Sequence, residues 1–299
     1  MYPGGKAGAG VYQRIINLMP PHQVYIEAFL GGAAIMRHKR PARLNIGIDR
    51  DPHVIQTVKF LWPSIFGDGG RAAFQFAEAD ALEYLAAYPW TGQEMVYCDP
   101  PYLMSTRSTR RRIYRHEMSE AEHRRLLEVL TTIKDHCMVM ISGYWSKLYE
   151  AYLGRPPWHT TSYQAMTRGG QLATESLWFN FSKPATLHDY KHLGADFRQR
   201  ERIQRKITRW TARLRKLPVL ERNAILAAIR DAARHTPAEL FPPGDYADFR
   251  ITAPPSAALD RSAEDRGPRR NRRGGPGAGQ SPARFITPGK GPSLKGEDL

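Results

Sequence analysis

The sequence is short of cysteine and of long apolar runs. Only two cysteines occur in 299 residues, Cys98 and Cys137, and both lie in apolar, strand-like runs. A disulfide scaffold is therefore excluded, and buried reduced thiols are expected. No run approaches the roughly 18 apolar residues of a transmembrane helix, and the first residues lack the charged start and apolar stretch of a secretory signal. These absences predict a soluble, intracellular protein in the cytoplasm, with no membrane partner.

Metal-ligand patterns are also missing, and acids are outnumbered by bases. The ten histidines show no spacing typical of a metal site, so no metal is expected. Lys and Arg number 44 against 29 acids, which gives a formal charge of +15. This excess favours a polyanionic partner such as nucleic acid. The 41% of hydrophobic residues are enough for a sizeable core.

Short apolar runs alternate with helix-like segments through the first 180 residues. This pattern predicts an α/β fold with a mostly parallel sheet and crossover helices. The helix at 119–135 should open with a capping box of Ser119 and Glu122. A closing antiparallel hairpin is expected around the turn TRGGQ. The predicted strands are 24–29, 44–49, 73–78, 94–98, 137–142 and the hairpin strands 161–166 and 175–181; the predicted helices are 32–40, 52–61, 81–88 and 119–135.

The composition changes near residue 184 and again near residue 251. Apolar residues in the basic segment that follows step by four and three, which predicts one helix with an apolar stripe, and 219–234 predicts a second helix. The stripe consists of Ile203, Ile207, Trp210, Leu214 and Leu217. This helical pair could contact DNA, pack on the core or form a homodimer. The remaining Gly/Pro/Arg-rich stretch predicts disorder. The expected organisation is a core at 1–183, a basic helical extension at 184–250 and a disordered tail at 251–299.

Acids and glycines follow the predicted strands where a ligand could bind. Gly31 and Gly32 lie between the first strand and its helix, where a bend lets a ligand approach the backbone. Asp49 ends the second strand, a position from which an acid binds ribose hydroxyls; the alternative is a helix N-cap. Asp80 ends the third strand and could contact an adenine edge or cap a helix.

The stretch MVYCDPPYL ends the fourth strand with a stiff loop, because prolines cannot donate to a β ladder. An exocyclic amine on a nucleobase is a poor nucleophile, since its lone pair is delocalised into the ring. If Asp99 and the carbonyl of Pro100 accept its two hydrogens, the lone pair is directed at an electrophile such as a methyl sulfonium. Tyr102 could stack on the base. The loop therefore predicts a site for methyl transfer to an amine.

Four motifs in this order resemble the Dam-like, D12 class of adenine-N6 DNA methyltransferases. They are YPGGK at 2–6, EAFLGGAA at 27–34, IGID at 46–49 and DPPY at 99–102. The resemblance implies a Rossmann-like fold with a seven-stranded, mostly parallel sheet that ends in a reversed hairpin, and S-adenosylmethionine as cofactor. By position it implies catalytic roles for Asp99, Pro100 and Tyr102. It implies cofactor contacts from Tyr2, Lys6, Phe29, Gly31, Gly32, Asp49, Asp80 and Asp99.

The resemblance implies double-stranded DNA as partner and is consistent with a role in restriction–modification. Many members insert a DNA-reading domain between the ribose acid and DPPY, but only 49 residues separate Asp49 from Asp99. We therefore expect DNA contacts from the arginines directly after DPPY, a segment that could also be a solvated loop. These are Arg107, Arg110, Arg111, Arg112 and Arg115.

Three other functions share these features. The target could be adenine in RNA or the N4 amine of cytosine, because these exocyclic amines are equally poor nucleophiles and need the same activation. The chain could also be an inactive DNA-binding protein with a methyltransferase fold. The presence of Lys6, Asp49 and the complete DPPY loop favours an active enzyme, which must extrude its target base from a duplex.

Overall fold

One seven-stranded sheet forms the centre of the fold. The computed structural model describes residues 6, 8, 10–66, 72–107, 111–166 and 170–234. The strand order is β3-β2-β1-β4-β5-β7-β6, with β1 to β5 parallel and β7 antiparallel to both of its neighbours. The strands are β1 (Val24–Ala28), β2 (Leu44–Asp49), β3 (Ala73–Glu78), β4 (Glu94–Cys98), β5 (Met138–Gly143), β6 (His159–Met166) and β7 (Leu172–Phe179). The predicted α/β class, the mostly parallel sheet and the reversed hairpin are confirmed.

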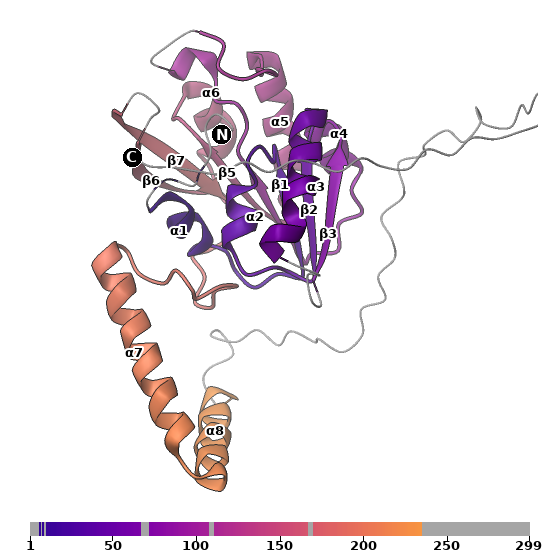
Figure 1. Ribbon diagram of the computed structural model, residues 1–299. Helices are drawn as coiled ribbons and strands as arrows, with labels where there is room; N and C mark the ends of the chain where they lie inside the picture. The colour runs from indigo at the N-terminus through magenta and orange to yellow at the C-terminus, as the bar shows by residue number, and fades with distance from the viewer. Residues whose placement is uncertain are drawn as a thin grey trace, which may run out of the picture. The chain divides into compact units, whose positions relative to one another are not determined.

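Helices cover both faces of this sheet and produce three layers (Figure 1). On one face, α1 (Val11–Ile16), α2 (Ala34–His38) and α3 (Pro52–Phe66) pack on strand residues such as Tyr25 and Tyr97. On the other, α4 (Ala81–Ala87), α5 (Glu120–Ile133) and α6 (Lys147–Leu153) pack on neighbours such as Ile26 and Val96. Successive strand residues point to opposite faces, so each strand supplies both cores.

Local sequence explains where the central helices begin. The predicted capping box is present: the Ser119 hydroxyl accepts from the Glu122 backbone N–H at 3.2 Å, and the Glu122 carboxylate accepts from the Ser119 N–H at 2.7 Å. The Asp80 side chain caps α4 by accepting from the backbone N–H groups of Leu82 and Glu83. Each cap satisfies backbone donors that the first helical turn leaves unpaired.

Several predicted boundaries were wrong or incomplete. Helices α1 and α6 were not predicted, and the hairpin strands are longer than expected and start earlier. β6 lies at the sheet edge, and of its residues only Tyr163 and Ala165 are buried. Its sequence is therefore mostly polar and lacks the apolar run that identifies a buried strand. A short 3-10 helix, η1 (Met104–Thr106), follows the DPPY loop. Both cysteines are buried and free.

Two helices follow the sheet in sequence, as the apolar spacing predicted. They are α7 (Phe197–Lys216) and α8 (Val219–Arg234). The chain divides into two units, Met1–Pro254 and Pro255–Leu299. The predicted disordered tail at 251–299 lies outside the described residues, and the predicted domain boundaries stay predictions.

The described residues contain neither a candidate membrane-spanning helix nor a candidate metal-binding group. No helix among them combines the length and the apolar character needed to cross a bilayer. Nor do they contain three or more His, Cys, Asp or Glu side chains grouped so that they could hold a metal ion.

Candidate active site

The loop after β1 has an unusual backbone. Phe29 and Ala33 have φ angles of 64° and 51°, and Gly31 lies between them at 49°. Non-glycine residues rarely adopt this left-handed conformation, and such residues cluster at ligand sites. Leu30 packs toward β2, where a Cβ on Gly47 would lie 2.8 Å from its side chain. Gly47 of the IGID motif therefore makes room for this loop, residues 29–32, at the edge of the sheet.

This loop, the end of β2 and the DPPY loop (residues 99–102) open onto one pocket. It encloses about 770 Å³ of space that is open to solvent. Its lining residues include Glu27, Phe29, Gly31, Gly32, Ile35, Asp49, Arg50, Asp99, Pro101, Tyr114, His116, Met118 and Lys6. The pocket lies at the carboxyl ends of β1 and β4, where the strand order reverses, which is where ligands bind in doubly wound sheets.

Asp49 is fixed by two backbone donors. One carboxylate oxygen accepts from the N–H of Gly31 at 2.9 Å, and the other accepts from the N–H of Asp51 at 2.9 Å. Burial raises the pKa of Asp49, and these two hydrogen bonds oppose the rise. Each carboxylate oxygen keeps a second lone pair. Asp49 can thus hold the glycine loop and still accept a hydrogen bond from a ligand hydroxyl.

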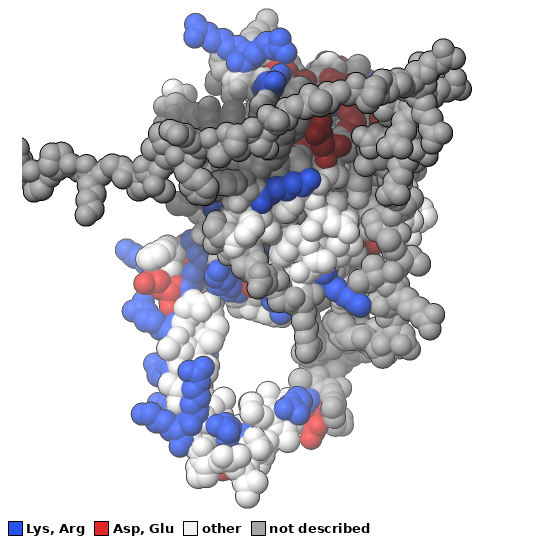
Figure 2. All heavy atoms as spheres, turned by 45° about the vertical axis from the view of Figure 1, so that its right-hand side comes forward, with Lys and Arg blue, Asp and Glu red and all other residues white. Residues whose placement is uncertain are grey.

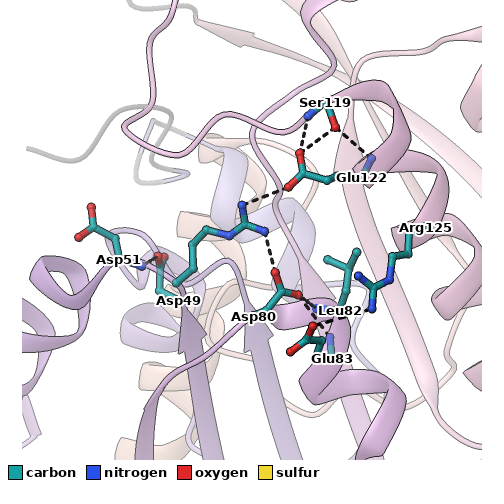
Figure 3. A network of polar contacts seen from close by, with 9 residues as sticks. Asp49, Asp51, Asp80, Leu82, Glu83, Ser119, Glu122 and Arg125 are labelled. Atoms are coloured by element: carbon teal, nitrogen blue, oxygen red, sulfur yellow. Dashed lines mark hydrogen bonds and ion pairs between the residues drawn. The ribbon is translucent and has the colours of Figure 1, made fainter.

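Asp80 has taken the capping role that the sequence offered as an alternative. Its Oδ1 accepts from the backbone N–H groups of Leu82 and Glu83 at 2.8 and 3.3 Å. Its Oδ2 lies 2.7 Å from the Arg50 guanidinium, whose other branch lies 3.2 Å from Glu122 (Figure 3). Arg50 thereby links the starts of α4 and α5 and lines the pocket. A contact between Asp80 and a cofactor stays a prediction.

Asp99 lies in a largely buried network of ion pairs with Lys6 and Glu175. The Lys6 ammonium is 2.7 Å from Asp99 Oδ1 and 3.4 Å from Glu175 Oε2. Burial raises the pKa of Asp99, and the charge of Lys6 counteracts that rise. Burial alone would lower the pKa of Lys6, but the two carboxylates hold it above its ordinary value. One oxygen of Asp99 is therefore engaged by a permanent cation, and Asp99 still lines the pocket.

Tyr102 lies in this network and not in the pocket lining. Its hydroxyl donates to Glu175 Oε2 at 2.9 Å and accepts from Lys6 Nζ at 2.5 Å. The ring contacts Tyr144 edge-on, with centroids 4.7 Å apart. Tyr102 is 9% exposed, so in this arrangement it anchors the loop instead of presenting a face for stacking. The stacking role stays a prediction. Pro100 is buried beside Asp99, and Pro101 lines the pocket.

Arg107 is placed differently from the expected DNA contact. Its guanidinium forms a two-pronged ion pair with Glu117 at 3.0 and 2.6 Å, and its Nε donates to the carbonyl of Tyr102 at 2.6 Å. Its side chain is only 5% exposed. Arg107 thus holds the Tyr102 backbone in place and connects it to Glu117. The guanidinium is already engaged by Glu117 and the Tyr102 carbonyl, and a DNA contact from Arg107 stays a prediction.

The other arginines of the cluster differ in exposure. Arg111 and Arg112 are exposed, and Arg110 lies outside the described residues. Arg115 is 61% exposed and lies 3.4 Å from Asp51. The same segment supplies Tyr114, His116 and Met118 to the pocket lining. It is therefore a wall of the site as well as a basic surface. DNA contacts from Arg110, Arg111, Arg112 and Arg115 stay predictions.

His123 supports the DPPY loop from the side of α5. It is fully buried, its Nδ1 lies 3.0 Å from the hydroxyl of Tyr149, and the carbonyl of Pro101 faces its ring. Burial, together with the charge of Arg107, lowers the pKa of His123 to about 4. The neutral imidazole is therefore the form that the fold accommodates.

Acidification should weaken the fold through His123. A folded-state pKa below the ordinary value of 6.5 means that the unfolded chain binds more protons between about pH 6.5 and pH 4, so stability falls as the pH falls. The expected loss from this residue by pH 5 is about 2 kcal/mol. Urea unfolding of the wild type and of His123→Gln at pH 7 and pH 5 measures it. Equal pH dependence in the two proteins would contradict the assignment.

Sequence reasoning missed three polar residues of the site. Glu175 and Tyr163 come from the closing hairpin, and their side chains share a 3.1 Å hydrogen bond. Glu27 lines the pocket, where burial raises its pKa to about 8 although Met36 N–H and Tyr25 donate to it. The usable signal was an acid inside an apolar strand, which burial makes costly unless it has partners. Tyr2, predicted for the cofactor, lies outside the described residues.

The family comparison bears directly on the DPPY loop. Residues 72–165 match the family model described as D12 class N6 adenine-specific DNA methyltransferase. This segment of the chain is similar to the D12 class. It contains Asp99, the DPPY loop and the Arg107–Glu117 pair, whereas Lys6, Asp49 and Glu175 lie outside the match. The family is S-adenosylmethionine-dependent. The predicted resemblance to this family and the predicted cofactor are thus confirmed, and the match supports S-adenosylmethionine-dependent methylation.

Comparisons with whole proteins are less informative. No curated protein matches the sequence. Among solved structures, the precorrin 8W decarboxylase of Methanobacterium thermoautotrophicum has 15% identity and a TM-score of 0.39, covering 60% of this chain and 93% of its own. A putative methylase from Haemophilus influenzae has 13% identity and a TM-score of 0.37, covering 57% and 84%. The magnesium protoporphyrin IX methyltransferase of Synechocystis, solved with bound SAM, has 12% identity and a TM-score of 0.36, covering 57% and 74%. Similarity at this level carries no argument about the substrate.

The residues present fit S-adenosylmethionine. The left-handed loop at Phe29 to Ala33 brings backbone to the pocket, and Asp49 retains acceptor capacity for ribose hydroxyls. Phe29, Ile35 and Met118 supply apolar surface for a purine, and Asp99 lies in the same lining. Cofactor and target base would thus meet at one end of the pocket.

Proposed function

We propose that this protein transfers a methyl group from S-adenosylmethionine to the N6 amine of adenine in double-stranded DNA. The observation that carries the proposal is that Asp99 of the DPPY loop lines the same pocket as Asp49 and the glycine loop. The match to the D12 class supports adenine N6 as the target. The formal charge of +15 supports a nucleic-acid substrate.

The chain's own residues would act by holding and polarising the amine. Asp99 and the carbonyl of Pro100 would accept its two N–H hydrogens, which shifts electron density to nitrogen. The bound cofactor supplies an electrophilic methyl group on sulfur. The amine nitrogen would form the N–C bond as the S–C bond breaks, with the thioether S-adenosylhomocysteine as leaving group, and would afterwards lose its extra proton to solvent. Lys6 and Glu175 would keep Asp99 in place throughout, so catalysis comes from positioning.

A duplex substrate requires the target adenine to leave the base stack. An amine inside a base pair cannot reach Asp99, so the base must be extruded into the pocket, at a cost of a few kcal/mol. Tyr114, His116 and Met118, which lie near Glu117 of the Arg107–Glu117 pair in the sequence, line the pocket, and an extruded base would lie beside them.

Nucleoside analysis tests the proposal. The full chain is incubated with labelled S-adenosylmethionine and mixed-sequence duplex DNA, single-stranded DNA or RNA, and the products are digested to nucleosides. N6-methyldeoxyadenosine from the duplex is the expected product. Label recovered only as N4-methylcytosine, or only from RNA, would replace this proposal with one of the alternatives. Absence of label from every nucleic acid would refute it.

A further inference from the structure

Helix α7 carries a one-sided basic surface that the pocket chemistry does not use. At about 100° per residue, seven cations fall within roughly one 100° arc of the helix. These are Arg198, Arg202, Arg205, Lys206, Arg209, Arg213 and Lys216, here called the basic face. All seven are exposed. Figure 2 shows several Lys and Arg side chains along this helical part of the chain.

The basic face lies on a different side of α7 from the apolar stripe. Ile203, Ile207, Trp210 and Leu214 are centred well over 100° away from it on the helix. Ile207 and Trp210 are 47% and 52% exposed. The Arg213 guanidinium lies over the Trp210 ring, 5.6 Å from its centroid. Packing through the stripe, whether on another part of the chain or on a second copy, would leave the other six cations available.

An ordinary solvated helix balances its charges, and α7 does not. Its one acid is Glu201, which pairs with Arg205 at 3.2 Å. The cations repeat at spacings of three and four, as in Arg202, Lys206 and Arg209, and like charges at these spacings repel each other. A polyanion would remove this repulsion. A lone solvated face would retain it.

The dimensions match a nucleic-acid backbone. From Arg198 to Lys216 the helix spans about 27 Å, at 1.5 Å per residue. A DNA strand presents one phosphate about every 3.4 Å of the duplex axis, so the face runs beside about eight phosphates of one strand. Long arginine and lysine side chains reach phosphates without reading bases.

We infer that the basic face of α7 is a phosphate-backbone clamp for duplex DNA that holds the substrate for the D12-class domain. The inference rests on the proposed function for its substrate class. It adds a second DNA contact surface to the one predicted for the arginines directly after DPPY. The clamp is sequence-independent, and it acts on affinity and on the Michaelis constant for DNA, not on the chemical step.

Charge neutralisation in the full chain tests the clamp. The variant carries Arg202→Gln, Lys206→Gln, Arg209→Gln and Arg213→Gln, because glutamine preserves helix propensity. A matched control carries four substitutions to Gln at other exposed cations, with the same change in net charge. These are Arg37, Arg40, Lys59 and Arg155. Binding of a labelled 30-base-pair duplex is measured by fluorescence anisotropy across a range of salt concentrations.

The clamp predicts a loss in the variant that the control does not share. Affinity should fall at least about 10-fold, and the slope of log K against log salt should fall by about 0.9 for each lost phosphate contact. If methylation is detected, the Michaelis constant for DNA should rise by a similar factor at unchanged kcat. Equal losses in variant and control would overturn the inference, as would tighter binding to an RNA duplex, or a changed oligomeric mass with unchanged DNA binding. The binding result stands whether or not methylation is detected, so failure of the proposed function is seen separately.

Discussion

Replacing Asp99 with alanine should abolish methyl transfer while sparing most of the affinity for DNA. Asp99 is the one acid of the DPPY loop, and it lines the pocket together with Asp49. Loss of a single preorganised group at a reacting centre typically costs about 10²–10³ in kcat. DNA affinity should change little, because removal of an acid takes away no phosphate contact. Product formation and duplex binding by the purified variant measure the two effects.

The test needs an isosteric variant and a charge control. Alanine leaves the Lys6 ammonium with Glu175 as its remaining carboxylate partner, and loss of one partner of a buried ion pair destabilises proteins by about 3–5 kcal/mol. Asp99→Asn keeps the shape and one acceptor oxygen, so it should fold better and still be strongly impaired. Asp135→Ala removes an acid that is 67% exposed and should behave as wild type. Normal methylation by folded Asp99→Asn and Asp99→Ala would refute the role given to Asp99.

Much of the sheet was predictable because its strands are apolar runs bounded by breakers. β2, β3 and β4 begin and end where predicted, and β1 differs by one residue. β2 and β4 are buried along nearly their whole length, and parallel strands buried on both faces leave this signal in any sequence. β6 is polar along most of its length because it lies at an edge. α6 has only seven residues, too few for a helical period to stand out. These elements depend on tertiary packing.

The pocket was partly predictable for a similar reason. Strand ends of a parallel sheet meet at one edge, so Asp49, Asp99 and the glycine loop had to lie near each other. No local pattern could place Lys6 against Asp99 and Glu175, since their contacts join the first residues, the fourth strand and the closing hairpin. Arg107 was predicted to contact DNA because it lies in an arginine-rich run of the sequence. Its burial against Glu117 is visible only in the folded structure.

Neutralising Glu175 should slow methyl transfer and shift the acid limb of its pH profile to lower pH. Glu175 lies 3.4 Å from the Lys6 ammonium and accepts from the Tyr102 hydroxyl at 2.9 Å. In Glu175→Gln, Lys6 would be left with Asp99 as its remaining anion, which weakens Asp99 as an acceptor for the amine. Loss of a charged hydrogen-bond partner is worth about 1.5–3 kcal/mol, so kcat should fall roughly 10- to 100-fold.

The pH dependence separates this positioning role from general damage to the fold. Burial raises the pKa of Asp99, and the negative charge of Glu175 adds to that rise. Removal of that charge lowers the pKa of Asp99, so the carboxylate persists to lower pH and the acid limb of the rate profile should move to lower pH. Tyr163→Phe is the matched control, because it removes one hydrogen bond to Glu175 at 3.1 Å without a change of charge. Its acid limb should stay in place. An unmoved acid limb in Glu175→Gln, or equal shifts in both variants, would show that Glu175 does not set the charge of Asp99.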